Sequence, residues 1–239
     1  MAAETTIDTS STYNVDYTSE DVVNAWQTKR LRMIRVEAGD DNVREALAVI
    51  QQDPVVTALA SSAALQPVGR ADLDGTISAI SGALLGVAIA LLPTEADHQR
   101  QQQEQQETPA GESDDAKRDD PGKPVIIGNM TLGWGGLSPR TAHHRSASMG
   151  ITLARAWQGR GYGGEAIGWM LDWAFCHAGL HTVSLSAASF NQRGVHLYRK
   201  LGFRVEGRRR ETIYFNRGWH DEIEFGITEH EWEALRRRN

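Results

Sequence analysis

The sequence predicts a mixed α/β domain, because segments with strand periodicity and segments with helix periodicity alternate along its 239 residues. Residues 83–92 are apolar at almost every position, which is typical of a central strand covered on both faces. Residues 164–175 instead carry apolar side chains at helical spacing. The 40% hydrophobic content supplies enough apolar surface for one core of this kind.

The first half of the chain is predicted to contain a strand, two helices and the central strand. Alternating apolar residues over 29–36 indicate the first strand. Asp40 can cap the following helix, which ends before Pro54, and Asp72 can open the next helix. The uncharged run 75–94 approaches the length of a membrane span, but its serines and glycines favour a helix end and the central strand.

Two segments are expected to lie outside the packed part of the chain. Residues 1–20 are rich in Ser and Thr without periodicity and predict a disordered N-terminal arm, which leaves 21–239 as a single domain. Residues 94–123 are Gln-rich and then acidic, and they predict a disordered loop inserted between two strands, because this composition buries too little apolar surface to offset ordering entropy. A short charged helix through the glutamine run is the alternative.

The second half of the chain is predicted to alternate strands and helices. Gly179 ends the first of these helices, while Asn191 caps the second and Gly202 closes it. The predicted strands lie at residues 124–132, 146–153, 181–187, 203–208 and 221–228.

Charge and cysteine usage exclude several classes of protein. The net charge of −6 resides in residues 95–120, which hold nine acidic and three basic side chains, so the rest of the chain is nearly neutral. This balance argues against nucleic acid or an anionic membrane as a partner. The single Cys176 excludes an internal disulfide, and the start of the chain lacks the basic and apolar pattern of a signal peptide, so we expect a cytoplasmic protein.

A glycine-rich segment, Gln158–Gly164, lies between a predicted strand and a predicted helix. Glycines at such a junction let backbone N–H groups converge, and the helix N-terminus adds partial positive charge, so the segment suits a diphosphate. Its position and spacing do not match the dinucleotide-binding pattern, and no Gly-Lys-Ser/Thr follows it as in a P-loop.

This segment resembles the Gln/Arg-x-x-Gly-x-Gly/Ala motif of the GNAT superfamily of N-acetyltransferases, matched by Gln158, Gly161 and Gly163. The similarity covers residues 124–228 and is typical of the RimJ/RimL-like branch. Its further segments are residues 162–175, 179–181, Asn191 and 197–207. The resemblance implies the GNAT fold, in which helices flank a mixed, mostly antiparallel central sheet with splayed middle strands.

The resemblance also implies acetyl-CoA as the cofactor, released as CoA. Backbone amides of the glycine-rich segment would hold the pyrophosphate, and the pantetheine arm would lie between the strands at 146–153 and 181–187. A backbone N–H near Thr152 or Leu153 would polarise the thioester carbonyl. The implied cofactor-binding residues are Ile151, Thr152, Leu153, Gln158, Gly159, Arg160, Gly161, Tyr162, Gly163, Gly164 and Asn191. Asn191 can also act simply as a helix cap.

Three residues are candidates for catalysis. Tyr198 matches the family tyrosine that protonates the departing thiolate, and a buried core tyrosine is the alternative. Many relatives place a glutamate base on the strand that enters the glycine-rich segment, but residues 146–153 contain no carboxylate. His143 and His144 are therefore the candidate base, and a surface role is their alternative.

Other side chains are candidates for the acceptor pocket. Asp221 and Glu222 could bind a cationic amine, although a solvated strand end would contain the same residues. Trp134, Trp157 and Trp219 could wall the pocket or serve packing.

The expected activity is direct transfer of an acetyl group to a primary amine, either a small molecule or a protein N-terminus. No metal is expected, and a monomer and a homodimer are both compatible with the sequence. Another acyl-CoA is an alternative cofactor. A CoA-binding sensor without catalysis and an interaction protein working through the acidic loop are the alternative functions.

Overall fold

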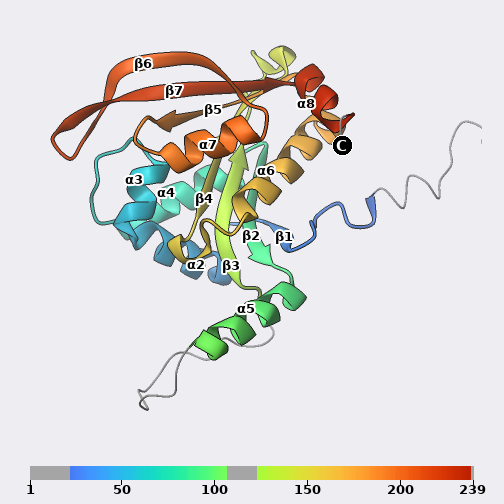
Figure 1. The fold of residues 1–239 in the computed structure, drawn as a ribbon, viewed down its shortest axis with the longest axis vertical. Coiled ribbons are helices and arrows are strands. Elements are labelled where there is room, and N and C mark those ends of the chain that lie inside the picture. Colours follow the sequence, from blue (N-terminus) through green and yellow to red (C-terminus); the bar gives the residue numbers. More distant parts are fainter. Residues whose placement is uncertain (1–21, 107–122, 238–239) are drawn as a thin grey trace, which may run out of the picture.

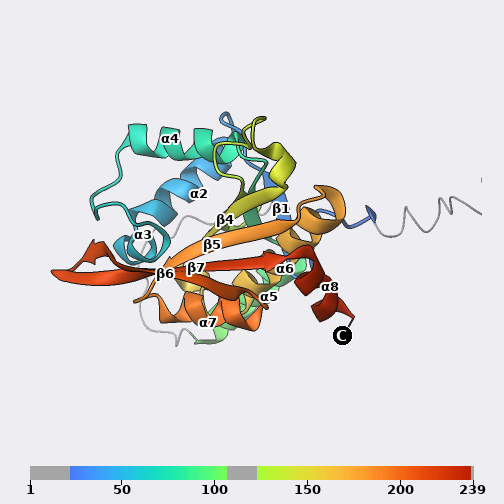
Figure 2. The ribbon, with the colours of Figure 1, turned by 90° about the horizontal axis from the view of Figure 1, so that it is seen from above.

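The computed structural model describes residues 22–106 and 123–237. The predicted N-terminal arm and residues 107–122 of the predicted loop lie outside the described residues. The described strands and helices form three layers, with a central sheet and helices on both of its faces (Figures 1 and 2). This arrangement confirms the predicted α/β class.

A seven-stranded sheet forms the middle layer of the described residues. Its strands are β1 (Leu31–Arg35), β2 (Leu85–Leu91), β3 (Ile126–Leu132), β4 (Ser146–Leu153), β5 (Thr182–Ala188), β6 (Arg204–Phe215) and β7 (Gly218–Thr228). The strand order is β1-β2-β3-β4-β5-β7-β6, and only β4 and β5 pair in parallel. The sheet is therefore mixed and mostly antiparallel, as the family resemblance implied.

Helices cover both faces of the sheet (Figure 2). One face carries α2 (Asp41–Gln52), α3 (Pro54–Ala60) and α4 (Arg70–Ser81), and the other carries α6 (Tyr162–Asp172) and α7 (Gln192–Lys200). Every residue of β2 is buried, because Val87 and Ile89 belong to the core cluster on one side and Ala88 to the cluster on the other. The long apolar run in the sequence is thus a central strand, as predicted.

The two middle strands separate along their length. The β4–β5 ladder contains three residue pairs and ends at Ser148 and Ser184, although β4 continues to Leu153 and β5 to Ala188. The later residues of β4 pair only with β3, and those of β5 only with β7. A gap therefore opens between the two strands toward the end of β4, and backbone groups on its edges are left without a strand partner.

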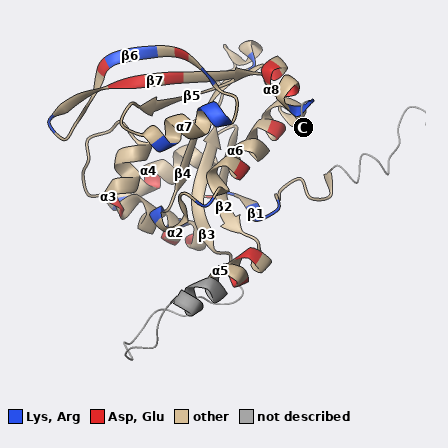
Figure 3. Cartoon of the chain, viewed as in Figure 1, with Lys and Arg blue, Asp and Glu red and all other residues tan. Residues whose placement is uncertain are grey.

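Helix α5 (Pro93–Gln106) corrects the prediction of a disordered loop over the first part of residues 94–123. The charged helix that the composition left open is present there. It projects from the domain after β2 (Figures 1 and 3). Side-chain contacts stabilise its first turns: Glu95 accepts from Gln99 (3.0 Å) and from Tyr162. A composition argument could not include these contacts because Tyr162 lies far along the chain.

Three further features differ from the predicted elements. The sequence did not predict α3, which begins with Pro54 and is capped by Asp53, or the C-terminal α8 (Glu229–Arg236). β6 and β7 extend well beyond the predicted strands into a long hairpin, which carries charged side chains along its middle and Tyr214, Phe215 and Trp219 near its tip. In the part of the chain that the structure describes, no helix combines the length and apolar character needed to cross a bilayer. The uncharged run 75–94 instead contains the second half of α4, all of β2 and the first residues of α5.

Candidate active site

A cavity of about 330 Å³ lies at the open end of the gap between β4 and β5. The end of β4, the glycine-rich loop, α7 and α3 form its walls. Ten of the residues predicted for cofactor binding or catalysis line it, namely Ile151, Thr152, Leu153, Gln158, Gly159, Gly161, Gly163, Gly164, Asn191 and Tyr198. The structure therefore brings most of the predicted site together in one place.

The glycine-rich loop has the backbone geometry that a diphosphate site requires. Gly159 and Gly161 have φ values of +76° and +87°, in the region that favours glycine, and Gly161 caps the N-terminus of α6. The first intrahelical bond is donated by Glu165 N–H to Gly161 O (3.2 Å), so the N–H groups of Gly163 and Gly164 precede it and remain open to a ligand. The residues present therefore fit a phosphate group at a helix N-terminus.

Gly163 also lies where three elements approach one another. A Cβ atom at this position would be 3.5 Å from Leu153 Cδ1 and 3.5 Å from Leu197 Cδ2. Any larger side chain has to extend toward the cavity, since both neighbours are apolar and packed. The absence of a side chain at Gly163 thus keeps the helix N-terminus accessible.

The Gln158 side chain connects the glycine-rich loop to β4 and α7 by hydrogen bonds. Its side-chain nitrogen donates to Leu153 O (2.8 Å) at the end of β4, and its oxygen accepts from Arg193 on α7 (2.5 Å). The first glutamine of the motif therefore fixes the loop between a strand and a helix, and it brings the Arg193 guanidinium to the cavity.

Cationic side chains of α7 line the cavity and were not predicted. Arg193 and Lys200 line it together with His196. These residues follow one another at intervals of three and four, so they share one face of the helix. That spacing was a usable signal, because a basic helical face beside a phosphate-binding loop suits an anionic ligand.

Tyr198 combines a packed ring with access to the cavity. Its ring lies edge-on to Phe203 and Phe225, with centroid distances of 6.1 and 5.7 Å. Burial raises the pKa of Tyr198 above its usual value, so the phenol carries its proton throughout the neutral range. This environment supplies a positioned proton donor next to the gap between the strands.

Asn191 has a structural role in addition to its place in the cavity wall. Its side-chain oxygen accepts from Gly194 N–H (3.0 Å), which caps α7, and its nitrogen donates to Leu59 O of α3 (3.2 Å). The predicted cap is confirmed, and the same residue connects α7 to the helix on the other side of the cavity.

Arg160 and Tyr162 point away from the cavity, toward α5. Tyr162 is fully buried and donates to Glu95, while Arg160 donates to Gln99. Burial and the Glu95 carboxylate raise the pKa of Tyr162 to about 12. The Arg30 guanidinium lies 4.4 Å over the Tyr162 ring. Only the backbone of these two loop residues is thus available to a ligand. Their side chains connect the loop to α5 on the side away from the cavity.

A second cavity, of about 530 Å³, adjoins the first across β4. The two cavities share Val56 and Ala60 of α3 and Ile151 and Thr152 of β4. The loop after α3, the start of α4 and strand β3 complete the second cavity. A molecule in one cavity can therefore meet a molecule in the other at the β4 backbone, which is the arrangement that a transfer between two substrates needs.

Comparison with known proteins identifies the family. The family model described as an acetyltransferase (GNAT) domain matches residues 30–204, which include β1 and the whole first cavity. The chain belongs to the GNAT acetyltransferase family.

Curated relatives of this GNAT chain share part of its length. It is 31% identical over 91 residues to spermidine N(1)-acetyltransferase of Escherichia coli, covering 38% of this chain and 49% of the relative. It is 37% identical over 78 residues to the Vibrio cholerae spermidine N(1)-acetyltransferase, covering 33% and 45%. The putative ribosomal N-acetyltransferase YdaF of Bacillus subtilis is 29% identical over 91 residues, covering 38% and 50%. The chain thus spans about half the length of the curated relatives it matches.

Solved structures support the GNAT fold over most of the chain. The spermidine N-acetyltransferase of Vibrio cholerae in complex with CoA and spermine superimposes with a TM-score of 0.61 at 19% identity, covering 86% of this chain and 99% of the other. A GNAT acetyltransferase from Bacillus anthracis superimposes with a TM-score of 0.60 at 17% identity, covering 85% and 98%. At such identities the likeness concerns the fold alone.

The structure does not bring the two candidate base histidines to this GNAT site. His143 and His144 lie in the exposed 3₁₀ turn Ala142–His144 before β4, with ring centroids 3.9 Å apart, and neither lines the two cavities. The full length of β4, about 25 Å at the usual rise per residue, separates them from the glycine-rich loop. Their placement gives no support to a role as the base.

The candidates for the acceptor pocket are also distributed differently from the prediction. Asp221 and Glu222 lie on the hairpin strand β7 and pair with Arg208 and with Arg209 (3.0 Å). The carboxylates are thus already neutralised and lie outside both cavities. The three tryptophans considered for the acceptor pocket also lie in three different places. Trp134 lines the second cavity, Trp157 packs edge-on to Tyr162, and Trp219 is exposed beside Tyr214.

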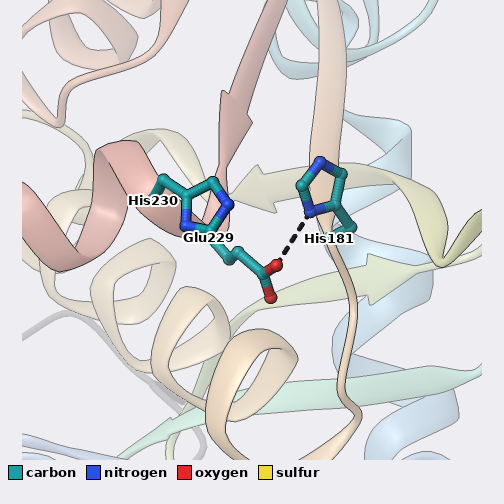
Figure 4. A group of neighbouring side chains, drawn as sticks. All are labelled: His181, Glu229 and His230. Carbon is teal, nitrogen blue, oxygen red and sulfur yellow. Dashed lines mark hydrogen bonds and ion pairs between the residues drawn. The ribbon is translucent and has the colours of Figure 1, made fainter.

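A separate polar group lies at the other end of β5 (Figure 4). His181 Nδ1 is 2.9 Å from Glu229 Oε1, and the donor atoms of His181, Glu229 and His230 lie within 4.8 Å of one another. The second Glu229 oxygen accepts from Arg145 (3.2 Å), and the carboxylate begins helix α8. Because Arg145, His181 and the helix N-terminus already compensate this carboxylate, the group connects β5 with α8 rather than offering charge to a cation.

A partly buried ion pair between Arg30, which precedes β1, and Glu165 of α6 provides a prediction about stability. Glu165 accepts from Arg30 Nε (2.7 Å), Arg30 N–H (2.9 Å) and Thr28 (2.5 Å). Burial acts to raise the pKa of Glu165, but these hydrogen bonds outweigh it and hold the pKa below 4.5. The stabilisation is therefore present above pH 4.5 and is lost as the pH falls through the folded-state value.

We expect Glu165→Gln to lower the free energy of unfolding by about 2 kcal/mol at pH 7, the usual loss for hydrogen bonds to a charged group. The difference from the wild type should shrink at acid pH, where the wild-type carboxylate also becomes neutral. Urea denaturation at pH 7 and pH 3 measures both values. Glu233→Gln is the matched control, since its exposed pair with Arg237 spans 3.7 Å. Equal differences at both pH values would contradict the assignment.

Proposed function

We propose that the protein is an acetyl-CoA-dependent N-acetyltransferase that moves an acetyl group to a primary amine by direct attack. The observation that carries the proposal is the glycine-rich helix N-terminus at the open end of the gap between β4 and β5, with Tyr198 in the same cavity. Family membership supports it, and so do the spermidine acetyltransferases among the relatives.

The chain offers a binding group for each part of acetyl-CoA, which supplies an acetyl thioester when bound. The N–H groups of Gly163 and Gly164 and the cations of α7 suit its phosphates. The backbone of Ile151 to Leu153 suits the pantetheine amides, because β5 leaves that edge of β4 unpaired. A β4 N–H facing the cavity suits the carbonyl oxygen of the thioester.

The reaction also requires proton transfers at the amine and at the sulfur. Transfer forms a C–N bond, breaks the C–S bond and leaves one proton to move from the amine and one to reach the sulfur. We assign the second proton to Tyr198, which burial keeps protonated. The described residues of β4 provide no carboxylate that could take a proton from the amine, so we propose that the amine enters neutral or loses its extra proton to solvent in the second cavity. After attack, the proton that leaves the nitrogen passes through solvent to the tyrosinate and restores Tyr198.

Two measurements test the proposal. Isothermal titration with acetyl-CoA measures binding, and thiol release in the presence of a panel of amines measures transfer. Micromolar binding followed by amine-dependent thiol release is the expected result. Binding without thiol release for any amine would favour the non-catalytic CoA-binding sensor, and no binding at millimolar acetyl-CoA would overturn both.

The cations of α7 provide a second prediction for this site. We expect the double variant Arg193→Ala, Lys200→Ala to bind acetyl-CoA about tenfold more weakly, a loss of about 1.4 kcal/mol, because both side chains line the cavity at the phosphate loop. Affinity for S-acetyl pantetheine, which has no diphosphate, should stay unchanged. Arg199→Ala, on the same helix but outside the lining, is the control. An equal loss for both ligands would show that α7 acts through packing.

A further inference from the structure

Two polar side chains of β3 line the second cavity and have no partner among the described residues. Asn129 and Thr131 on β3 are 9% and 3% exposed, and they are the two buried polar residues of the described core. Among the described residues neither side chain has a hydrogen-bond partner, and both line this cavity. Among the described residues no fully buried side-chain nitrogen or oxygen lacks a hydrogen-bond partner, so the polar atoms of Asn129 and Thr131 reach the open space of the cavity. They are therefore available to form hydrogen bonds with a molecule bound there.

The sheet register directs these groups to the same face as the reaction site. Asn129 pairs with Thr152 and Thr131 with Gly150, so all four residues lie on the α2–α4 side of the sheet. A Cβ atom on Gly150 would lie 3.3 Å from the Thr131 hydroxyl, and glycine leaves that hydroxyl open to the cavity. Asn129 thus lies beside the β4 segment that both cavities share.

The cavity carries almost no charge. Among the described residues that line it, Asp72 on the first turn of α4 is the one charged side chain, and the other polar groups are amides and hydroxyls. Its Oδ2 atom accepts from Gly69 N–H (2.8 Å). Asp72 thus lies at the N-terminus of α4, where the helix dipole is positive.

We propose that this cavity binds an amine acceptor with a single positive charge whose remaining polar groups are uncharged. Asp72 attracts the ammonium group, and Asn129 and Thr131 form hydrogen bonds with amide or hydroxyl groups of the acceptor. This inference rests on the proposed acetyltransferase function and names the acceptor class for it.

A polyamine fits the cavity less well than such a monocation. Several curated relatives are named as spermidine acetyltransferases, and a polyamine keeps one or more ammonium groups besides the one that reacts. Each additional charge would enter a cavity with one carboxylate and would lose hydration without a partner. A polymethylene chain would also offer no hydrogen bond to Asn129 and Thr131.

Putrescine and N-acetylputrescine form a matched pair that tests the proposal. The two ligands differ only in that an uncharged amide replaces one ammonium group. Binding of each is measured by isothermal titration to protein saturated with CoA, so that the result does not depend on turnover. We expect N-acetylputrescine to bind at least about tenfold more tightly, the ratio that corresponds to 1.4 kcal/mol.

Two variants locate the recognition. Asp72→Asn should weaken N-acetylputrescine binding about tenfold, while Asp74→Asn, two residues along α4 and outside the cavity lining, should leave it unchanged. Thr131→Val keeps the side-chain shape, and it should weaken N-acetylputrescine but not putrescine. Thermal melting verifies that each variant is folded.

Several results would overturn the inference. These are tighter or equal binding of putrescine, no binding of either ligand at millimolar concentration, and affinities that Asp72→Asn does not change. Failure of the proposed function is seen separately, because either CoA then does not bind in the saturation step or CoA binds and no amine gives thiol release.

Discussion

Replacing Gly163 with aspartate is expected to weaken acetyl-CoA binding by at least about 100-fold and to abolish thiol release at ordinary cofactor concentrations. Two unit charges of the same sign 4 Å apart repel by about 4 kcal/mol in a partly solvated protein site, which exceeds the value needed for that loss. The new carboxylate must point into the cavity, because Leu153 and Leu197 occupy the space on the other sides of a Cβ atom.

Gly163 is a better position for this test than Gly161, which has a φ of +87°. An aspartate at Gly161 would strain the backbone as well as add charge, and the two effects could not be separated. Only the charge and volume change at Gly163. Gly161→Asp therefore serves as a second variant, with an expected loss of both affinity and thermal stability.

The controls for Gly163→Asp separate charge from size and from general damage to the helix. Gly163→Ala adds only a methyl group at van der Waals distance from its neighbours and should bind acetyl-CoA within about threefold of the wild type, as small packing changes of this kind cost little. Gly168→Asp puts the same charge on α6 where no atom lies within 4 Å of a Cβ, and it should leave affinity unchanged. Wild-type affinity in Gly163→Asp would place the diphosphate elsewhere.

The cofactor half of the site could be predicted from the sequence because its signals are local. Gln158, Gly161 and Gly163 lie within six residues, and the helix and strand on either side have clear periodicities of their own. In the structure Gly159 and Gly161 have positive φ, a backbone conformation that glycine adopts without strain. The basic face of α7 was not predicted, because Arg193, His196 and Lys200 are separated in the sequence and share a face only through the helical turn.

The proposed acceptor half of the site could not be predicted, because its parts are distant in the sequence. Asp72 comes from α4 and Asn129 from β3, and only the strand register brings Asn129 beside Thr152. In the sequence Asn129 and Thr131 are two polar residues within an apolar strand, which resembles an ordinary strand with one solvated face. Their burial depends on α2, α3 and α4, and α3 was not predicted at all.

Tyr198→Phe is expected to lower kcat about 100-fold, which is the lower end of the range for loss of a general acid. The KM for acetyl-CoA should not change. Phenylalanine keeps the ring contacts with Phe203 and Phe225, so the fold and the cavity shape should persist. Thiol release at saturating acetyl-CoA measures kcat. Tyr214→Phe, at a 61% exposed position on the hairpin, is the matched control and should not change it.

The pH dependence of this variant distinguishes chemistry from packing. Burial raises the pKa of Tyr198 above 10.0, so a proton donor at this position keeps its proton, and its contribution to kcat, through pH 9. The ratio of wild-type to Tyr198→Phe kcat should therefore stay constant from pH 7 to pH 9 and fall only as the phenol ionises at higher pH. If Tyr198 were a core tyrosine alone, the ratio would be close to one throughout, because the substitution removes only the hydroxyl. Unchanged kcat in Tyr198→Phe would assign protonation of the leaving thiolate to solvent or to the α7 cations and would leave the binding half of the site intact.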